Sequence, residues 1–530
     1  MSRQSGWKRA ALGAVVIALA VAPAACSKAG GATSGDSSAS TTAALKHGGT
    51  GIVLGPTDPN TLDPAIVFNN SESGSALLSA LYDGLFTIST TGQIQPRIAE
   101  SFTTTDGISW TLKLRPGVKF SDGTPFNAAA VKDEWERILQ PSNESVNAQF
   151  LAAVSSMTVV GDLTLVIKLE AVNYQFKQAV ASTSLTWIPS PTAVQKYGKN
   201  FASHPVGAGP FVLSSISPQV ETVMKRNPDY WRKGKPYLDE LIFKFNPDQQ
   251  QSIEAVQAGQ ADVTTPVDVE DQKSAKADGL DIASIPMAGI DAWFFNQSRP
   301  PFNNALAREA VYDAVNEQQI NNDVYGGLIQ APTSIVAKSS VLYDPDSTFS
   351  PPDPKKAQQL FNQLAAEGHP VKFTYPYQDV TVFRQQATAL ETQLAAYKNV
   401  TIQLEPEDVA SYTQFVLQDN YDMIELGLFG GDPEPVVYTA LYTGAGANFG
   451  HVNDPAIDSA VLAGRSTASN TQRRGDYARL VQALNKEYVA LWAFSPSAND
   501  GAAAYSPSFN APQMYGEGTV LWDSWGQLAK

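Results

Sequence analysis

Residues 96–125 read PRIAESFTTTDGISWTLKLRPGVKFSDGTP, and this stretch carries successive strand and turn signals. Apolar and polar residues alternate from Trp110 to Leu114, which predicts a strand with one buried face. Arg115-Pro116-Gly117 and residues 121–125 are turn sequences. Asn127 then predicts the N-cap of a helix, because apolar residues recur at helical spacing after it: Val131, Trp135, Ile138 and Leu139.

Strand and helix signals alternate along the rest of the chain. Apolar runs predict strands at 163–169, 241–245 and 421–428. In the second half, helices are predicted from Asp353 to near Gly368 and from Arg384 to Tyr397, with strands at 371–375 and 400–404. The strand, helix, strand unit 371–404 implies a parallel pair with a right-handed crossover. The predicted fold class is therefore α/β, with mixed sheets.

The composition excludes several classes of protein. The chain has 530 residues, too many for one core, and its 43% apolar and 17% charged content excludes disorder for most of its length. It carries 37 Lys and Arg against 52 Asp and Glu, a formal charge of −15 that disfavours a nucleic-acid partner. One cysteine and four scattered histidines form no metal-ligand cluster, so we expect no metal and no cofactor.

The sequence contains no recognisable catalytic motif. GxSxG, HExxH, GxxxxGK[ST] and GxGxxG are all absent, and the glycine-rich residues 444–450 have the wrong spacing for a dinucleotide loop. Acid pairs such as Glu405 and Glu407 are common in a chain with 52 acids and specify no site. We therefore do not expect an enzyme.

The N-terminus predicts an exported protein. Basic residues precede an apolar stretch from Ala10 to Ala22, followed by Pro23-Ala24-Ala25-Cys26, which is typical of a signal peptide covering residues 1–25. Ala-Ala-Cys resembles the lipobox of bacterial lipoproteins, which makes Cys26 the lipidation candidate; an unmodified cysteine in an ordinary secretory leader is the alternative. Residues 26–47, rich in Ser, Thr, Gly and Ala, predict a flexible tether.

Several blocks resemble the family 5 extracellular solute-binding proteins, the peptide-binding receptors of bacterial ABC importers. The most specific block is 96–125. Before it stand GGT at 48–50, TLDPA at 61–65 and LYDGLF at 81–86, and after it PVGAGPF at 205–211, RNPDYW at 226–231 and GKPYLDEL at 234–241. Phe295-Asn296, PPF at 300–302 with Arg308, and Asp454-Pro455 with Asp458 follow in the family's order. The resemblance covers roughly residues 48–490.

This resemblance implies a two-lobed clamp of the periplasmic-binding-protein type, with helices flanking its mixed sheets. Lobe 1 would comprise residues 48–287, lobe 2 residues 288–489, and residues 490–530 would return to lobe 1. Two crossover segments would form a hinge, and ligand would lie in the cleft between the lobes. Closure would then make contacts from both lobes available only to the bound state.

The resemblance also suggests where the ends of a peptide would bind. In peptide-binding members, an aspartate near the end of a second-lobe strand pairs with the ligand's α-ammonium, and Asp432 is the candidate here. A solvated Asp-Pro turn is the alternative. Dipeptide-binding members carry an arginine on the strand corresponding to 371–378, where this chain has Tyr375 and Tyr377, so a strict dipeptide receptor is disfavoured.

Other candidate ligand contacts have an equally simple structural explanation. Asp291 and Trp293 lie on the strand that would enter lobe 2, where Trp293 could stack on a ligand or fill a buried strand. Asn70 and Glu72, in the loop after the first strand, and Asn448, in the loop 444–450, could face the cleft or belong to solvated loops.

We therefore predict the monomeric, lipid-anchored substrate-binding subunit of an ABC importer. It would lie at the outer face of the cell membrane, or in the periplasm, and would deliver oligopeptides to a permease and ATPase complex. Two alternatives stay open: another solute, such as an oligosaccharide, or a cell-surface sensor or peptide chaperone.

Overall fold

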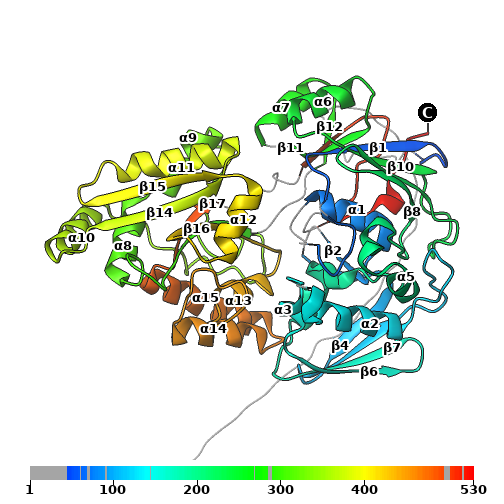
Figure 1. Cartoon of the computed structure of the whole chain (residues 1–530), viewed down its shortest axis with the longest axis horizontal. Coiled ribbons are helices and arrows are strands. Elements are labelled where there is room, and N and C mark those ends of the chain that lie inside the picture. Colours follow the sequence, from blue (N-terminus) through cyan, green and yellow to red (C-terminus); the bar gives the residue numbers. More distant parts are fainter. Residues whose placement is uncertain are drawn as a thin grey trace, which may run out of the picture. The chain divides into compact units, whose positions relative to one another are not determined.

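The computed structural model describes residues 44–59, 61–67, 72–89, 92–143, 145–267, 269–283, 289–494, 502–515 and 519–529. Helices and strands alternate along most of this part (Figure 1), and the predicted α/β class is confirmed. Among these residues, no helix combines the length and the apolar character that crossing a membrane requires.

The largest sheet joins the two ends of the described chain. Its seven strands have the order β12-β18-β11-β1-β10-β9-β8. β1 is parallel to β10 and to β11, whereas the other neighbours are antiparallel, so the sheet is mixed. The strands are β1 (Thr50–Gly55), β8 (Phe211–Ser217), β9 (Glu221–Arg226), β10 (Glu240–Phe245), β11 (Val263–Val267), β12 (Asp281–Ala283) and β18 (Ala502–Tyr505).

The stretch 96–125 forms the start of a second, antiparallel sheet with the order β4-β5-β7-β6. Gly117 and Gly123 turn the chain after β5 with φ of +78° and +84°, values that glycine adopts without strain. Asn127 caps α2 (Ala128–Ile138), as predicted, by accepting a hydrogen bond from the Ala130 N–H. The strands of this sheet are β4 (Ala99–Thr104), β5 (Ser109–Leu114), β6 (Val154–Val160) and β7 (Thr164–Leu169).

The second half of the chain has its own sheets. β13 (Gly289–Phe295) lies between β16 (Met423–Phe429) and β17 (Ala490–Phe494), antiparallel to both. β14 (Val371–Gln378) and β15 (Val400–Glu407) form the predicted parallel pair around α11 (Thr381–Leu394). α11 begins and ends three residues earlier than predicted. The Arg384 N–H already makes a helical bond to the Val380 carbonyl, whereas the N–H groups of residues 396 and 397 bond to carbonyls only three residues before them, as in turns.

Helices cover these sheets, and two short hairpins complete the fold. α10 begins at Pro354 as predicted, with the Asp353 side chain accepting from the N–H groups of Lys355 and Lys356. The hairpins pair β2 (Phe86–Ile88) with β3 (Ile94–Pro96) and β19 (Met514–Tyr515) with β20 (Thr519–Val520). The other helices are α1 (Glu72–Tyr82), α3 (Ala148–Leu151), α4 (Phe176–Ser182), α5 (Pro191–Tyr197), α6 (Gln249–Gln257), α7 (Val269–Ala277), α8 (Ala305–Ala314), α9 (Glu317–Tyr325), α10 (Pro354–Ala366), α12 (Val409–Leu417), α13 (Val436–Leu441), α14 (Pro455–Arg465) and α15 (Asn470–Glu487).

The buried apolar residues form separate clusters along the chain. One cluster runs from Ile290 to Ala493, and the others draw on residues before 284 and after 501. Within the described ranges, two hydrogen bonds join these parts directly: the Tyr174 N–H donates to the Arg465 carbonyl at 2.8 Å, and Gln175 Nε2 donates to the Thr467 carbonyl at 2.9 Å. The residues between 289 and 494 therefore pack largely among themselves.

Candidate ligand-binding site

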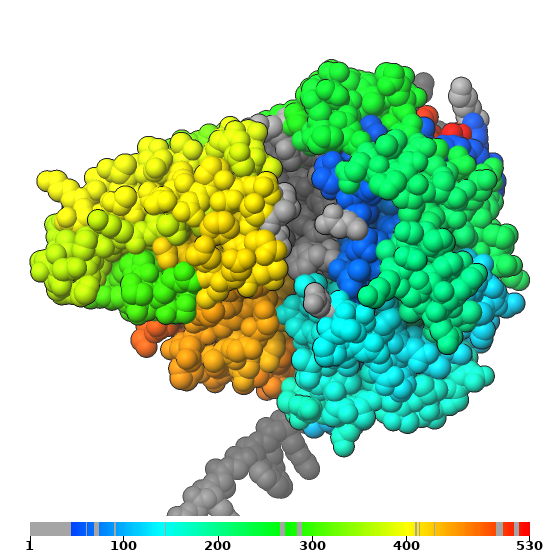
Figure 2. Space-filling view, in the orientation of Figure 1, coloured from blue at the N-terminus to red at the C-terminus, as the bar shows by residue number. Residues whose placement is uncertain are grey.

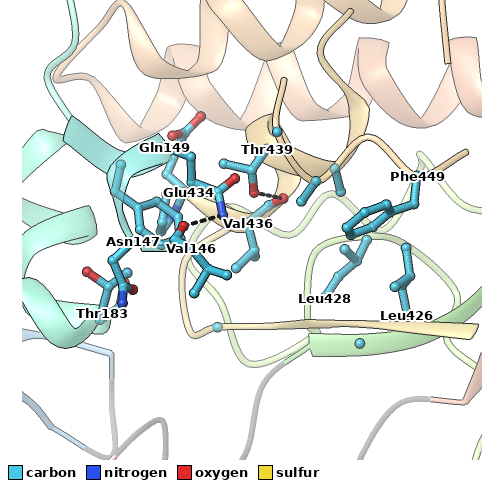
Figure 3. A pocket seen from close by; sticks show the side chains of 18 of the residues that line it. Val146, Asn147, Gln149, Thr183, Leu426, Leu428, Glu434, Val436, Thr439 and Phe449 are labelled. Carbon is cyan, nitrogen blue, oxygen red and sulfur yellow. Dashed lines mark hydrogen bonds between the residues drawn. The ribbon is translucent and has the colours of Figure 1, made fainter. Parts of the chain in front are cut away.

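A cavity of about 420 Å³, called the main cavity below for its apolar walls and not for its size, opens between segments that are far apart in the sequence. On one side lie residues 145–150 around α3 and residues 182–183; on the other lie β16, α13 and the loop 446–449. The first side is cyan and the second side yellow to orange in Figure 2. Figure 3 shows the side chains of both sides pointing into the space between them.

The wall of this cavity is mostly apolar. Leu426 and Leu428, two residues apart on β16, point toward Phe449 (Figure 3). Two apolar lining residues are open to solvent: Leu417 is 70% exposed and Val146 is 43% exposed. Both side chains therefore present apolar surface to whatever enters the cavity.

Most polar side chains of the lining already bond within the protein. Asn147 Nδ2 donates to the Val67 carbonyl at 3.0 Å, Thr183 Oγ1 to the Ala179 carbonyl at 2.7 Å, and Thr439 Oγ1 to the Val436 carbonyl at 3.0 Å. Gln149 Nε2 donates to the Val146 carbonyl at 3.0 Å, but the buried Gln149 Oε1 has no partner in the described structure. The polar lining thus leaves an acceptor open at Gln149.

Glu434 supplies the one ionisable side chain among the described residues that line the cavity. It is only 2% exposed, and Arg465 Nη2 donates to its Oε2 at 3.0 Å. The Arg465 guanidinium in turn lies 3.5 Å from the centre of the Tyr438 ring. Burial raises the pKa of Glu434, and its second oxygen, Oε1, has no partner among the described residues.

Asp432, the candidate amine partner, lies two residues away and meets another arginine. Arg473 Nη1 donates to Asp432 Oδ2 at 2.7 Å, Arg473 Nη2 donates to Oδ1, and the Glu434 N–H donates to Oδ1 at 3.0 Å. Three of about four acceptor positions of the carboxylate are therefore used. Asp432 lines a small crevice beside Gly289 and Val436, not the main cavity. Its pairing with a ligand amine stays a prediction.

A second cavity, of about 630 Å³, adjoins the first and shares Leu417, Gly446 and Phe449 with it. Asn448, a predicted contact, belongs to its lining. Asn448 Nδ2 donates to the carbonyls of Tyr442 and Val452, at 3.1 and 2.8 Å, and its Oδ1 accepts from the Val452 N–H at 2.8 Å. Its amide therefore holds its own loop together.

Trp293, Tyr375 and Tyr377 lie together in the core of the second half. Trp293 is 1% exposed and packs edge to face on Tyr375, with ring centres 6.3 Å apart. Tyr375 Oη donates to Glu425 Oε2 at 3.0 Å, and Tyr377 packs beside it with ring centres 6.0 Å apart. Burial raises the pKa of Glu425 to about 7. None of these three aromatic side chains lines one of the cavities described here.

Of the remaining predicted residues, Asp291 is described by the structure and lines none of these cavities. Asp291 lies on β13, opposite Gly427 of β16 and Phe494 of β17. Cys26 and Asn70 lie outside the described residues. Glu72 begins α1, but its side chain also lies outside what the structure describes.

The sequence did not point to most of the residues that line the main cavity. Val146, Gln149 and Leu417 belong to segments with no motif, and only tertiary contacts bring them together. Glu434 had a local signal, since the acid lies between two prolines directly after the apolar strand, in Asp432-Pro433-Glu434-Pro435.

An apolar cavity with a few convergent polar groups, set between two separately packed parts of an α/β fold, is typical of proteins that bind small ligands. Residues 93–450 match the bacterial extracellular solute-binding proteins, family 5 Middle. The chain therefore belongs to the family 5 extracellular solute-binding proteins.

Related sequences include glutathione-binding proteins. The chain is 31% identical over 316 residues to the glutathione-binding protein GsiB of Salmonella typhi, and 30% identical to GsiB of Escherichia coli O157:H7. In both cases the match covers 59% of this chain and 60% of the relative, so the chain aligns with less than two thirds of their length.

Solved structures show the same fold at lower identity. AgaA from A. tumefaciens R10, in complex with agropinic acid, superposes with a TM-score of 0.81 at 24% identity and covers 91% of this chain and 99% of AgaA. The oligopeptide-binding protein AppA of Bacillus subtilis, in complex with a nonapeptide, gives a TM-score of 0.78 at 18% identity over 92% of this chain and all of AppA. This likeness establishes the periplasmic-binding-protein fold.

Proposed function

We propose that this protein is the substrate-binding subunit of an ABC importer, which captures oligopeptides outside the cell and delivers them to a permease and ATPase complex. Membership in the family of extracellular solute-binding proteins supports this role. The observation that carries it is the cavity of about 420 Å³, because its walls come from residues 145–183 and 417–449 together. A ligand held there contacts both parts of the chain at once.

The division into lobes is part of this proposal. A cluster confined to residues 290–493 supports a second lobe that folds around its own core. The pairing of β17 (Ala490–Phe494) with β13 supports a return to the first lobe after Phe494, later than the expected boundary at 490. The hinge would then lie where the chain enters β13 and where it leaves β17. Ligand binding would then shift the population from the open to the closed state.

The nearest alternative is a smaller or modified peptide. The 31% identity to glutathione-binding proteins favours a compact ligand of that kind over an oligosaccharide. A surface sensor or chaperone that binds peptide without delivering it would use the same site.

Native mass spectrometry of the protein purified from its own host tests the proposal directly. We expect an additional mass that fits one peptide or a set of peptides, lost on unfolding and restored by adding the identified peptide. A co-purified sugar or opine, or no binding of any peptide in a calorimetric screen, would contradict the peptide assignment.

A further inference from the structure

The mouth of the main cavity holds two apolar side chains that the protein leaves uncovered. Val146 comes from the segment before α3, and Leu417 is the last residue of α12, so the two belong to opposite walls. Val146 is 43% exposed and Leu417 is 70% exposed. Burying them against a ligand would gain free energy in proportion to the apolar area removed from water.

The interior of the cavity offers unpaired acceptors among its described side chains. Gln149 Oε1 and Glu434 Oε1 are both buried and both lack a hydrogen-bond partner in the described structure. The hydroxyls of Thr183 and Thr439, and one N–H of the Asn147 amide, donate to backbone carbonyls. A buried acceptor without a partner is costly, so a ligand that brings a donor is favoured over one that brings another acceptor.

The charge around these acceptors disfavours ligand groups of either charge and favours a neutral donor. Glu434 is the only ionisable residue of the described lining, so an anionic ligand group would lie beside a second buried carboxylate, and no lining cation would balance the added charge. Arg465 already balances Glu434, through the contact at 3.0 Å, so a cationic group would leave an uncompensated positive charge. A neutral donor fits both conditions.

We propose that the main cavity receives an apolar, aromatic side chain of the ligand that carries one neutral hydrogen-bond donor, namely an indole or a phenol. This inference rests on the proposed function and specifies the ligand of that same site. A cavity of about 150 Å³ already accommodates benzene in another protein. The space of about 420 Å³ therefore admits a bicyclic ring. Leu417 and Val146 contact the ring, and Gln149 or Glu434 accepts its N–H or O–H.

The test compares tripeptides that differ only in the central residue: Ala-Trp-Ala, Ala-Phe-Ala, Ala-Glu-Ala, Ala-Lys-Ala and a version of the first with 1-methyltryptophan. Calorimetry on the full chain should show the tryptophan peptide binding about tenfold or more tightly than the charged peptides, because a buried unbalanced charge is costly. Methylation of the indole nitrogen should weaken binding by about two- to tenfold, since it removes one hydrogen bond.

Variants of the protein separate the apolar contact from the hydrogen bond. Gln149→Leu should reduce the difference between the tryptophan and 1-methyltryptophan peptides. Val146→Ser should lower the affinity for the tryptophan peptide and for the phenylalanine peptide by a similar factor. Val220→Ser is the matched control, because Val220 is 61% exposed but lies outside the cavity, and it should leave every affinity unchanged.

The outcomes distinguish this inference from the proposed function. If all five peptides bind equally well, the cavity does not select an aromatic donor, while the peptide-binding role stands. If no peptide binds but N-acetyl-tryptophan amide does, by saturation-transfer NMR, the cavity chemistry stands and the peptide role fails. If neither binds, both are overturned.

Discussion

Asp432 and Glu434 stand two residues apart in one turn, yet each carboxylate pairs with a different arginine. Arg473 reaches Asp432 from α15, and Arg465 reaches Glu434 from the end of α14. The two pairs fix the short segment that follows β16. A ligand amine would therefore have to share Asp432 with a guanidinium that is already in place.

A double-mutant cycle tests whether this sharing occurs. Asp432→Asn keeps an acceptor for Arg473 but removes the charge, and N-acetylation of the peptide removes the ligand's charge. If Asp432 pairs with the ammonium, each change alone should weaken binding by about 1.5 to 3 kcal/mol, the range for hydrogen bonds to charged groups. The two losses should not add. Calorimetry on the four combinations gives the coupling energy, and full additivity would leave Asp432 as a positioning residue of its turn.

Glu425 gives a prediction for the pH dependence of stability. Burial raises its folded-state pKa to about 7, from an ordinary value of 4.5. Between these two values the folded state binds more protons than the unfolded state, so the contribution of Glu425 to stability falls as pH rises from 4.5 to 7. Glu425→Gln removes this contribution. The free energy of unfolding of this variant, compared with that of the native protein, should therefore be higher at pH 8 than at pH 5.

Urea denaturation at pH 5, 6, 7 and 8 measures this effect. Glu170→Gln is the control, since Glu170 is an exposed acid, and its stability difference from the native protein should not change with pH. A Glu425→Gln difference that is equally flat would show that Glu425 is ionised in the folded protein across the whole range.

At the scale of elements, α1 packs against the segment 205–210 through two glycines that leave no space for a side chain. A Cβ at Gly209 would collide with the Ala80 carbonyl oxygen, and one at Gly207 with the Leu81 carbonyl oxygen. The Gly209 N–H also donates to the Leu81 carbonyl at 2.9 Å. The GAG sequence within PVGAGPF is thus needed for this backbone approach.

Two glycine substitutions should change stability in opposite directions. Gly209→Ala should lower the free energy of unfolding by about 1 to 3 kcal/mol, because the backbone must shift to admit the methyl group. Gly475→Ala, in α15 with no atom near its Cβ position, should raise it by about 0.5 to 1 kcal/mol through helix propensity. Chemical denaturation of both variants under the same conditions provides the comparison, and equal effects would refute the packing argument.

Local sequence signals predicted many of the elements, because caps and periodicity act over a few residues. Asn127 and Asp353 mark helix starts by side-chain bonds to nearby N–H groups, and the alternation from Trp110 to Leu114 marks β5. The end of the second part was harder to predict. Residues 490–494 form an apolar run that could belong to either sheet, and only pairing with β13 assigns them.

The residues that line the cavity were much harder to predict from the sequence than the helices and strands were. Leu417 is an ordinary apolar residue at the end of an apolar helix, and its 70% exposure follows from what the rest of the chain leaves uncovered. Trp293 shows the opposite case, since a tryptophan on a strand suggests a stacking platform, yet here it fills a core beside Tyr375. Burial at such positions depends on tertiary packing, which no local pattern encodes.

At the scale of the whole molecule, the predicted attachment to the membrane would depend on Cys26. If this cysteine is acylated, Cys26→Ser should move the protein from the membrane fraction to the soluble fraction, because the two acyl chains supply the attachment. Immunoblots of fractionated cells expressing each form measure the distribution. The same distribution for both forms would favour the ordinary secretory leader.

The proposed clamp predicts a change of size on binding. Closure of two lobes brings their mass together, so small-angle scattering should give a smaller radius of gyration at saturating peptide than without it. The peptide to use is the one identified by mass spectrometry, with a scrambled sequence as control. Identical scattering profiles would count against hinge closure.

Phe449, Leu417 and Gly446 belong to the walls of both cavities and thus form a partition that the two spaces share. We expect this partition to limit the length of the occupant, while the sheets and helices that hold it stay the same. Phe449→Ala should open the partition and admit longer peptides, which a length series in the calorimetric screen would reveal. Related receptors could thus acquire specificity for ligands of different length through changes at this partition alone, while the rest of the fold stays the same.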